Sequence, residues 1–313
     1  MPEWWDDESD AILAGDLTAA LGYRTPAGGV VVLAVAPIGL RDREAGTAGF
    51  TTSLGFSRKL ERIARDPRVA LAFHAREHGT ADSVRYLLVQ GHARVVEEPS
   101  PAERARVQEH AEARLGPARR GPFLDRWLRE YYAVRVPVWV QVERLTSWPD
   151  LRCAGTASTS GSAPAADPPP SQTAPGNGTG PRVDVARAAR RVRGTAHALL
   201  GYAGSDGFPV VVPVDVESVG DDGLGLSAAA PLPPGARRAG LLGHTYRPQL
   251  IGLESRAYTG WLEVGEDGRA LYAPHTEAGY RAPASKTGLL LLNGLLAKRG
   301  VRQARRAGTA KAR

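Results

Sequence analysis

The chain has 313 residues, of which 42% are hydrophobic and 23% are charged; this composition can build a core, and the length suits about two domains of ~150 residues. The lone cysteine, Cys153, excludes an internal disulfide and a cysteine metal cluster, and no apolar run approaches the ~18 residues that cross a membrane. The net charge of +7 is concentrated in a basic stretch at residues 297–313, which predicts a solvated tail and argues against a nucleic-acid partner.

The first residues, "MPEWWDDESDAIL", are acidic and lack the pattern of a charged segment followed by an apolar one that a secretion signal shows. We therefore expect a cytoplasmic protein. A strand, a glycine-rich turn and a second strand follow over residues 20–35. Further apolar runs predict strands at 46–52, 68–74, 84–97 and 136–145.

Three helices are expected between these strands. At 57–66, Leu60 and Ile63 share one face, and Pro67 ends the helix. At 100–115, a Ser-Pro start is typical of a helix N-terminus. Residues 123–134 form the third helical run.

Residues 154–182 are small, polar and rich in proline, which predicts a disordered linker. This linker separates a first domain at 1–153 from a second at 183–282, and a helix with the basic tail is expected at 283–313. Within the second domain, strands are expected at 209–218, 223–228, 249–254, 257–265 and 268–273. Short strands with turns between them suit a barrel wall, so the fold class is mainly β with helices (α+β).

The two halves share a stretch of similar sequence. "ALGYRTPAGGVVVLAV" at 20–35 and "LLGYAGSDGFPVVVPV" at 199–214 align without a gap. Leu, Gly and Tyr at 21–23 match Leu, Gly and Tyr at 200–202, and valines match at two neighbouring positions further on. This agreement indicates an internal duplication.

A run of hydroxyl groups and cations stands where the first half passes from a strand to a helix. The hydroxyls belong to Thr51, Thr52, Ser53 and Ser57, and the cations to Arg58 and Lys59. The first N–H groups of a helix lack partners, and its dipole favours an anion there. The run therefore has the parts of a phosphate site, although Ser57 as a simple cap beside two solvated cations would explain it equally well.

The order of these elements resembles the flavin-binding split barrel of the pyridoxamine 5'-phosphate oxidase-like superfamily. The resemblance covers about residues 10–148 and depends on the strand end at Thr51–Ser53, the Ser57–Lys59 turn, the Asp66–Leu71 segment and Gly91. The second half has only a degenerate motif, with Arg237 and Arg238 in place of Arg58 and Lys59. The resemblance thus implies two FMN-binding split β-barrels in one chain, joined by the linker, with one competent and one degenerate site.

In such proteins the turn binds the phosphate of FMN, or the polar tail of a deazaflavin coenzyme or a haem. The resemblance therefore implies a cofactor site made of Thr51, Thr52, Ser53, Ser57, Arg58, Lys59, Arg85 and Tyr86. Tyr86 stands where the oxidase has a glutamine, and the strand "VVVLAV" lacks the basic residues of the true oxidase. These two departures argue against pyridoxamine phosphate oxidation itself.

The resulting hypothesis is a flavin- or deazaflavin-dependent oxidoreductase acting on a small molecule, with its two barrels paired within the chain or in a homodimer. The alternatives are a non-catalytic flavin or haem carrier or sensor, and a binding module for another phosphorylated ligand or a nucleic acid. A haem would need an axial ligand, for which His74 or His244 are the candidates. The seven histidines show no metal-binding spacing, and no catalytic residue is assigned.

Overall fold

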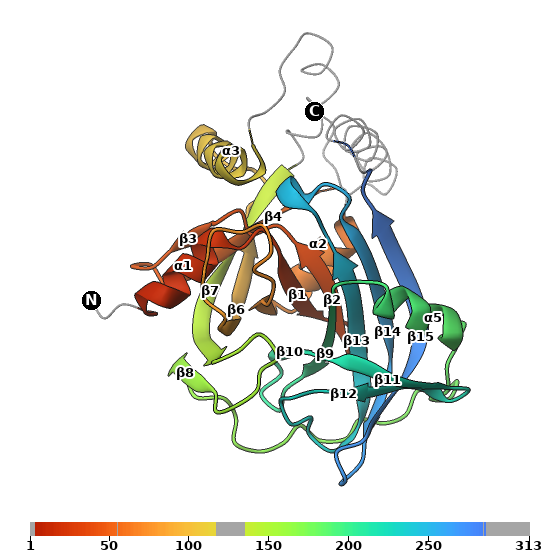
Figure 1. Cartoon of the computed structure of the whole chain (residues 1–313). Coiled ribbons are helices and arrows are strands. Elements are labelled where there is room, and N and C mark those ends of the chain that lie inside the picture. The colour runs from red at the N-terminus through yellow and green to blue at the C-terminus, as the bar shows by residue number, and fades with distance from the viewer. Residues whose placement is uncertain (1–3, 55, 117–134, 284, 286–313) are drawn as a thin grey trace.

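The computed structural model describes residues 4–54, 56–116, 135–283 and 285. The helix expected at 123–134 lies outside these residues, as does nearly all of the C-terminal helix and tail expected at 283–313. None of the helices in the described ranges is long and apolar enough to span a membrane. Two curled antiparallel sheets lie side by side, the first in red to yellow and the second in green to blue (Figure 1).

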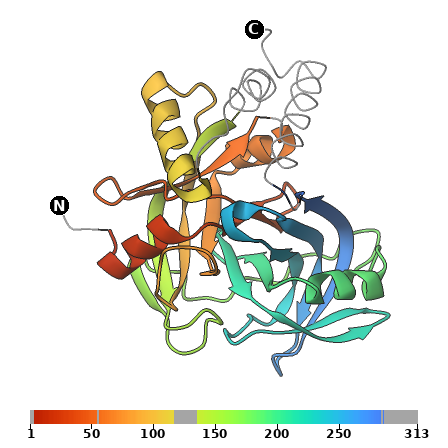
Figure 2. The ribbon, with the colours of Figure 1, turned by 45° about the horizontal axis from the view of Figure 1, so that its top comes forward.

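The first sheet has the strand order β2-β1-β5-β6-β7-β4-β3, and β8 pairs with β7. Its elements are α1 (Asp7–Gly15), β1 (Ala19–Arg24), β2 (Val30–Val35), β3 (Arg41–Asp42), β4 (Thr47–Ser53), α2 (Ser57–Arg65), β5 (Arg68–Phe73), β6 (Tyr86–Val95), α3 (Pro101–Leu115), β7 (Arg135–Trp148) and β8 (Ser158–Gly161). The predicted strands of this half and the helices at 57–66 and 100–115 are confirmed. Ser100 and Glu103 form a capping box at the start of α3, and α3 stands out from the body of the molecule (Figure 2).

The second sheet has the order β10-β9-β13-β14-β15-β12-β11. Its elements are α5 (Val185–Arg193), β9 (His197–Ala203), β10 (Pro209–Pro213), β11 (Asp215–Gly220), β12 (Gly223–Ser227), β13 (Gly235–Thr245), η1 (Pro248–Leu250), β14 (Glu254–Val264) and β15 (Ala270–Arg281). Strand for strand, this order repeats that of the first sheet. The chain therefore contains two split β-barrels, each preceded in the sequence by a helix, α1 or α5.

Two predictions for the second half are wrong. Arg237 and Arg238 were expected to take the place of Arg58 and Lys59 in a degenerate cofactor motif, but residues Gly235–Thr245 form β13, the counterpart of β5. Gly240 allows β13 to pack closely against the first barrel, because a Cβ at this position would lie 2.6 Å from the carbonyl oxygen of Val30. No strand forms at 249–253, where Gln249 and Leu250 have positive φ angles of 61° and 58°.

The linker at 154–182 is also not disordered as expected, because it is hydrogen-bonded to both barrels. The backbone N–H of Gln172 donates to the carbonyl of Ala236 at 2.7 Å, and its side-chain amide donates to the carbonyl of Gly28 at 3.0 Å. The residues that suggested disorder have small side chains, so their backbone can approach the barrels and form hydrogen bonds with them. This segment therefore packs against both barrels in addition to linking them along the chain.

The interface between the barrels is formed by the segments whose sequences the two halves share. Successive residues of β1 point to opposite faces, so Leu21 enters the core of the first barrel while Gly22 faces the second barrel. A Cβ on Gly22 would lie 2.9 Å from Val211 Cγ2, and a Cβ on Gly201 would lie 2.3 Å from Val32 Cγ2. The two contacts are related by a pseudo-twofold axis, since these glycines and valines occupy matching positions of the repeat.

We expect Gly201→Val to destabilise the protein by about 1–3 kcal/mol, because the added methyl groups would overlap Val32. Gly220→Val is the matched control, since nothing lies within 4 Å of a Cβ at that position. Urea unfolding of both variants measures the difference. Adding Val32→Ala to the Gly201 variant should restore part of the loss, and equal midpoints for the two single variants would contradict this account of the interface.

Candidate functional site

The turn between β4 and α2 presents an uncapped helix end. The N-cap residue is Phe56, which makes no side-chain capping bond, and the first turn of α2 carries no acidic residue. Ser57 is the first helical residue and not the cap, so the simple explanation of its position fails. The helix end therefore offers the partial positive charge that favours an anion.

Arg135, the first residue of β7, joins this turn. It pairs with Ser53 across the sheet, and its guanidinium donates to Thr51 Oγ1 from Nη2 at 2.5 Å and from Nε at 3.1 Å. Partial burial and the nearby charge of Arg135 lower the pKa of Lys59 to about 8. A cation that is desolvated beside another cation is ready to accept an anionic partner.

Thr52 supplies a buried hydroxyl whose partner is absent from the described residues. Its side chain is 6% exposed, and its Oγ1 has no hydrogen-bond partner in that part of the chain. A buried polar atom without a partner costs free energy, of the order of 1–3 kcal/mol. An acceptor group bound at the strand end would offset this cost.

The other predicted residues of the turn lie at its surface. Ser57 and Arg58 are exposed, and Ser53 is half-buried. None of the pockets of about 440, 220 and 200 Å³ that the described residues line includes this turn. The structure thus brings together Thr51, Lys59 and the unpredicted Arg135, with Arg58 open to solvent beside them.

Arg85 and Tyr86 contact other groups. The Arg85 guanidinium lies 2.9 Å from the carboxylate of Asp6 and 3.0 Å from that of Glu8, which ties it to the N-terminal segment. Tyr86 is fully buried against the second barrel, where its hydroxyl donates to the carbonyl of Val211 at 2.5 Å. In this structure both residues hold parts of the fold together, and none of their hydrogen bonds or ion pairs to described residues reaches the β4–α2 turn.

The corresponding strand end of the second barrel has different side chains. Strand pairing aligns Ser227 with Thr51, so that two alanines, Ala228 and Ala229, replace Thr52 and Ser53. No helix stands between β12 and β13. Arg237, expected to substitute for the turn cations, is instead 1% exposed on β13, with its guanidinium 5.8 Å from the ring of Tyr202.

Three histidines that are far apart in the sequence meet between the barrels. His74 and His244 occupy matching positions of the repeat, and their Nε2 atoms lie 2.6 Å apart. Burial lowers the pKa of both rings, that of His74 to about 3. His197 lies beside them, with its ring centroid 5.1 Å from that of His244. Within the described residues, no group of three or more His, Cys, Asp or Glu side chains is arranged to hold a metal ion.

Arg135 and the histidine cluster were missed because their neighbours are set by pairing between distant segments. The strand predicted at 136–145 begins one residue after Arg135, but only its register with β4 places this cation opposite Ser53. The alignment of the two halves at 20–35 and 199–214 stops short of the histidines. Extending it through β5 and β13 would have matched His74 with His244.

No family model and no curated protein matches the chain. Solved structures that resemble part of it include a conserved hypothetical protein from Mycobacterium tuberculosis, 24% identical over 48% of this chain and 88% of that one, with a TM-score of 0.36. Another is described as an F420 reductase, 23% identical over 46% of this chain and 98% of that one, with a TM-score of 0.32. A third, from Nostoc punctiforme, is described as a pyridoxamine 5'-phosphate oxidase-related, FMN-binding protein; it is 10% identical over 64% of this chain and 87% of that one, with a TM-score of 0.30.

The lowered pKa of Lys59 predicts unusual reactivity. At pH 8 about half of its side chains should be neutral, whereas an ordinary lysine has a pKa of about 10.4. Acetylation of Lys59, followed by mass spectrometry across a pH series, should show a midpoint near pH 8. Arg135→Ala should move that midpoint upward because it removes the neighbouring positive charge, and a midpoint near pH 10 in the unaltered protein would contradict the prediction.

Proposed function

We propose that the first barrel binds a flavin-type cofactor, FMN or a deazaflavin coenzyme, with its anionic tail at the β4–α2 turn. The observation that carries this proposal is the convergence of Lys59 and Arg135 on a helix end that lacks both a side-chain cap and an acidic residue. The Thr52 hydroxyl, which has no partner among the described residues, and the exposed guanidinium of Arg58 supply further donors. A phosphate accepts several hydrogen bonds and carries the charge that this arrangement favours.

Each residue has a distinct part in this proposal. Arg58 presents a planar fork to two phosphate oxygens, while Lys59 acts as a point charge. Arg135 holds the Thr51 hydroxyl and adds its charge to the same place. A bound anion would raise the pKa of Lys59 toward its ordinary value, because the charged form would gain a partner.

We further propose that the protein is an oxidoreductase. A flavin-type cofactor, when bound, supplies hydride or electron transfer, and the protein then contributes binding, orientation and exclusion of water. No nucleophilic side chain is required for such a reaction. A carrier that binds the same cofactor without catalysis is the alternative, and turnover with a reduced nicotinamide distinguishes the two.

The second barrel is proposed to bind no flavin phosphate. Its matching strand end offers Ser227 with two alanines, and Arg237 points into the barrel beside Tyr202. The haem alternative receives little support from the histidines, because His74 and His244 use their Nε2 atoms on each other. The expected stoichiometry is therefore one flavin per chain.

Titration of FMN against the purified protein, followed by quenching of flavin fluorescence, tests the proposal. We expect Arg58→Ala and Lys59→Ala each to weaken binding about tenfold or more, since each removes a charged donor. Arg65→Ala is the matched control, because this exposed arginine lies in the last turn of the same helix. The deazaflavin coenzyme is titrated in parallel to decide between the two cofactors.

Riboflavin, which lacks the phosphate, sharpens the test. The unaltered protein should prefer FMN to riboflavin, and Lys59→Ala should largely remove this preference. Equal FMN affinity in the unaltered protein and in both turn variants would refute the proposed site. FMN binding that depends on the turn but yields no redox turnover would support the carrier instead of the enzyme.

A further inference from the structure

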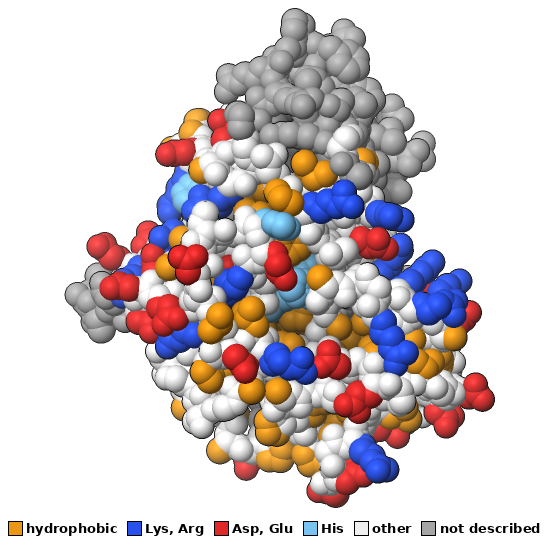
Figure 3. Space-filling model, in the orientation of Figure 1, with side chains coloured by type: hydrophobic (Ala, Val, Ile, Leu, Met, Phe, Trp, Pro, Cys, Tyr) orange, Lys and Arg blue, Asp and Glu red, His pale blue; other side chains and the backbone are white. Residues whose placement is uncertain are grey.

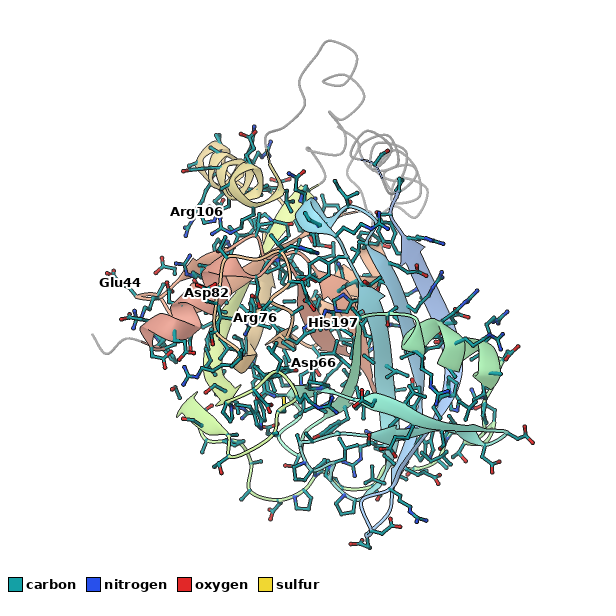
Figure 4. The ribbon with its side chains drawn as sticks, viewed as in Figure 1. Glu44, Asp66, Arg76, Asp82, Arg106 and His197 are labelled. Carbon is teal, nitrogen blue, oxygen red and sulfur yellow. The ribbon has the colours of Figure 1, made fainter. Side chains whose placement is uncertain are left out.

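A pocket of about 220 Å³ lies where the two barrels meet, outside the site proposed for the flavin. Its walls are apolar side chains of the second barrel, among them Leu199, Val214 and Ala228, and its polar groups include His74 and His197. Histidine side chains reach the surface near the centre of this face, with hydrophobic side chains around them (Figure 3). Figure 4 places His197 in the same central region, between the sheets.

The pocket occupies the place that corresponds to the β4–α2 turn of the first barrel. Ser227, Ala228 and Ala229 line it, and they match Thr51, Thr52 and Ser53. Two of the three hydroxyls are therefore lost, and no helix end or lysine faces the space. A pocket with these walls suits an apolar body rather than a phosphate.

His197 presents a hydrogen-bond acceptor. Its Nε2 lies 3.1 Å from Glu77 Oε2, and because a carboxylate only accepts, Nε2 must carry the proton. The hydroxyl of Tyr246 donates to the carbonyl of Glu77 at 2.9 Å and so holds this residue in place. In the neutral ring Nδ1 is then an acceptor, and no described residue is hydrogen-bonded to it.

The residues that line the pocket carry no net charge, since the Glu77 carboxylate behind His197 is not among them. His74 donates from Nδ1 to the carbonyl of Ala72 at 3.0 Å, so its Nε2 accepts a hydrogen bond from the Nε2–H of His244. Burial lowers the pKa of His74 and of His197, which keeps both rings neutral near pH 7. Arg152 and Asp215, both exposed, neutralise each other through a contact of 2.5 Å.

We propose that this pocket binds a small uncharged molecule with an apolar, ring-sized body and one hydroxyl or N–H group, which donates a hydrogen bond to Nδ1 of His197. Glu77 is the positioning residue, since it fixes the tautomer of the ring. The second barrel has therefore exchanged a phosphate site for a neutral one. This inference is independent of flavin binding at the β4–α2 turn.

Absorbance titration with 3-nitrophenol at pH 7 tests the proposal, because this weaker acid stays largely un-ionised where His197 is neutral. We expect a saturable shift of its absorption band and at least about tenfold weaker binding of 3-nitroanisole, which has the same ring but no O–H donor. His197→Ala should weaken binding of the phenol by a similar factor. Ala228→Phe, a half-exposed position, should abolish binding by filling the pocket.

Two variants serve as controls. His92→Ala removes an exposed histidine of the first barrel and should leave phenol binding unchanged. Lys59→Ala should also leave it unchanged, which separates this pocket from the flavin site. If His197→Ala does not fold, Ala228→Phe decides the question. The proposal is overturned by the absence of a saturable shift, by equal affinity for phenol and anisole, or by phenol affinity that Ala228→Phe leaves intact.

Discussion

The close approach of two glycine-bearing strands to two valines is the constraint on which the rest of this molecule depends. Val32 lies against Gly201, and Val211 against Gly22, at distances that leave no room for a Cβ. Because both contacts come from matching positions, they fix one barrel against the other about a pseudo-twofold axis. This contact also determines which residues meet beside it: His74 and His244 face each other at the axis, and the strand end of the second barrel shares a pocket with His74.

Duplication within one chain frees the two halves to differ. A homodimer must repeat every change in both subunits, since both have one sequence, whereas here each barrel has its own side chains. The first barrel has cations and hydroxyls at an uncapped helix end. The second has alanines and a neutral histidine at the matching place. The paired fold is thereby retained while the two strand ends differ in charge, as the two binding proposals require.

Much of the first barrel could be predicted because its signals are local. Apolar runs, Pro67 and the Ser100 cap each act within a few residues, so β4–β7, α2 and α3 were expected close to where they occur. The failures in the second half have separate causes. β13 forms where a turn with Arg237 and Arg238 was expected, and its Gly240 lies against Val30, a residue distant in the chain, whereas the strand expected at 249–254 is interrupted by positive φ angles at Gln249 and Leu250. The linker was likewise misjudged, because its hydrogen bonds go to the barrels and not to itself.

The sequence by itself determined the duplication, the mainly β class, and the run of hydroxyls and cations from Thr51 to Lys59, because these are properties of neighbouring residues. Only the tertiary structure decided that Arg135 joins that run, that Arg85 and Tyr86 brace the fold, and that His74, His197 and His244 meet. The reason is strand register: a residue's neighbours across a sheet or between barrels depend on how far one strand is shifted against another. That shift is set by packing of the whole barrel and cannot be inferred from any single segment of the sequence.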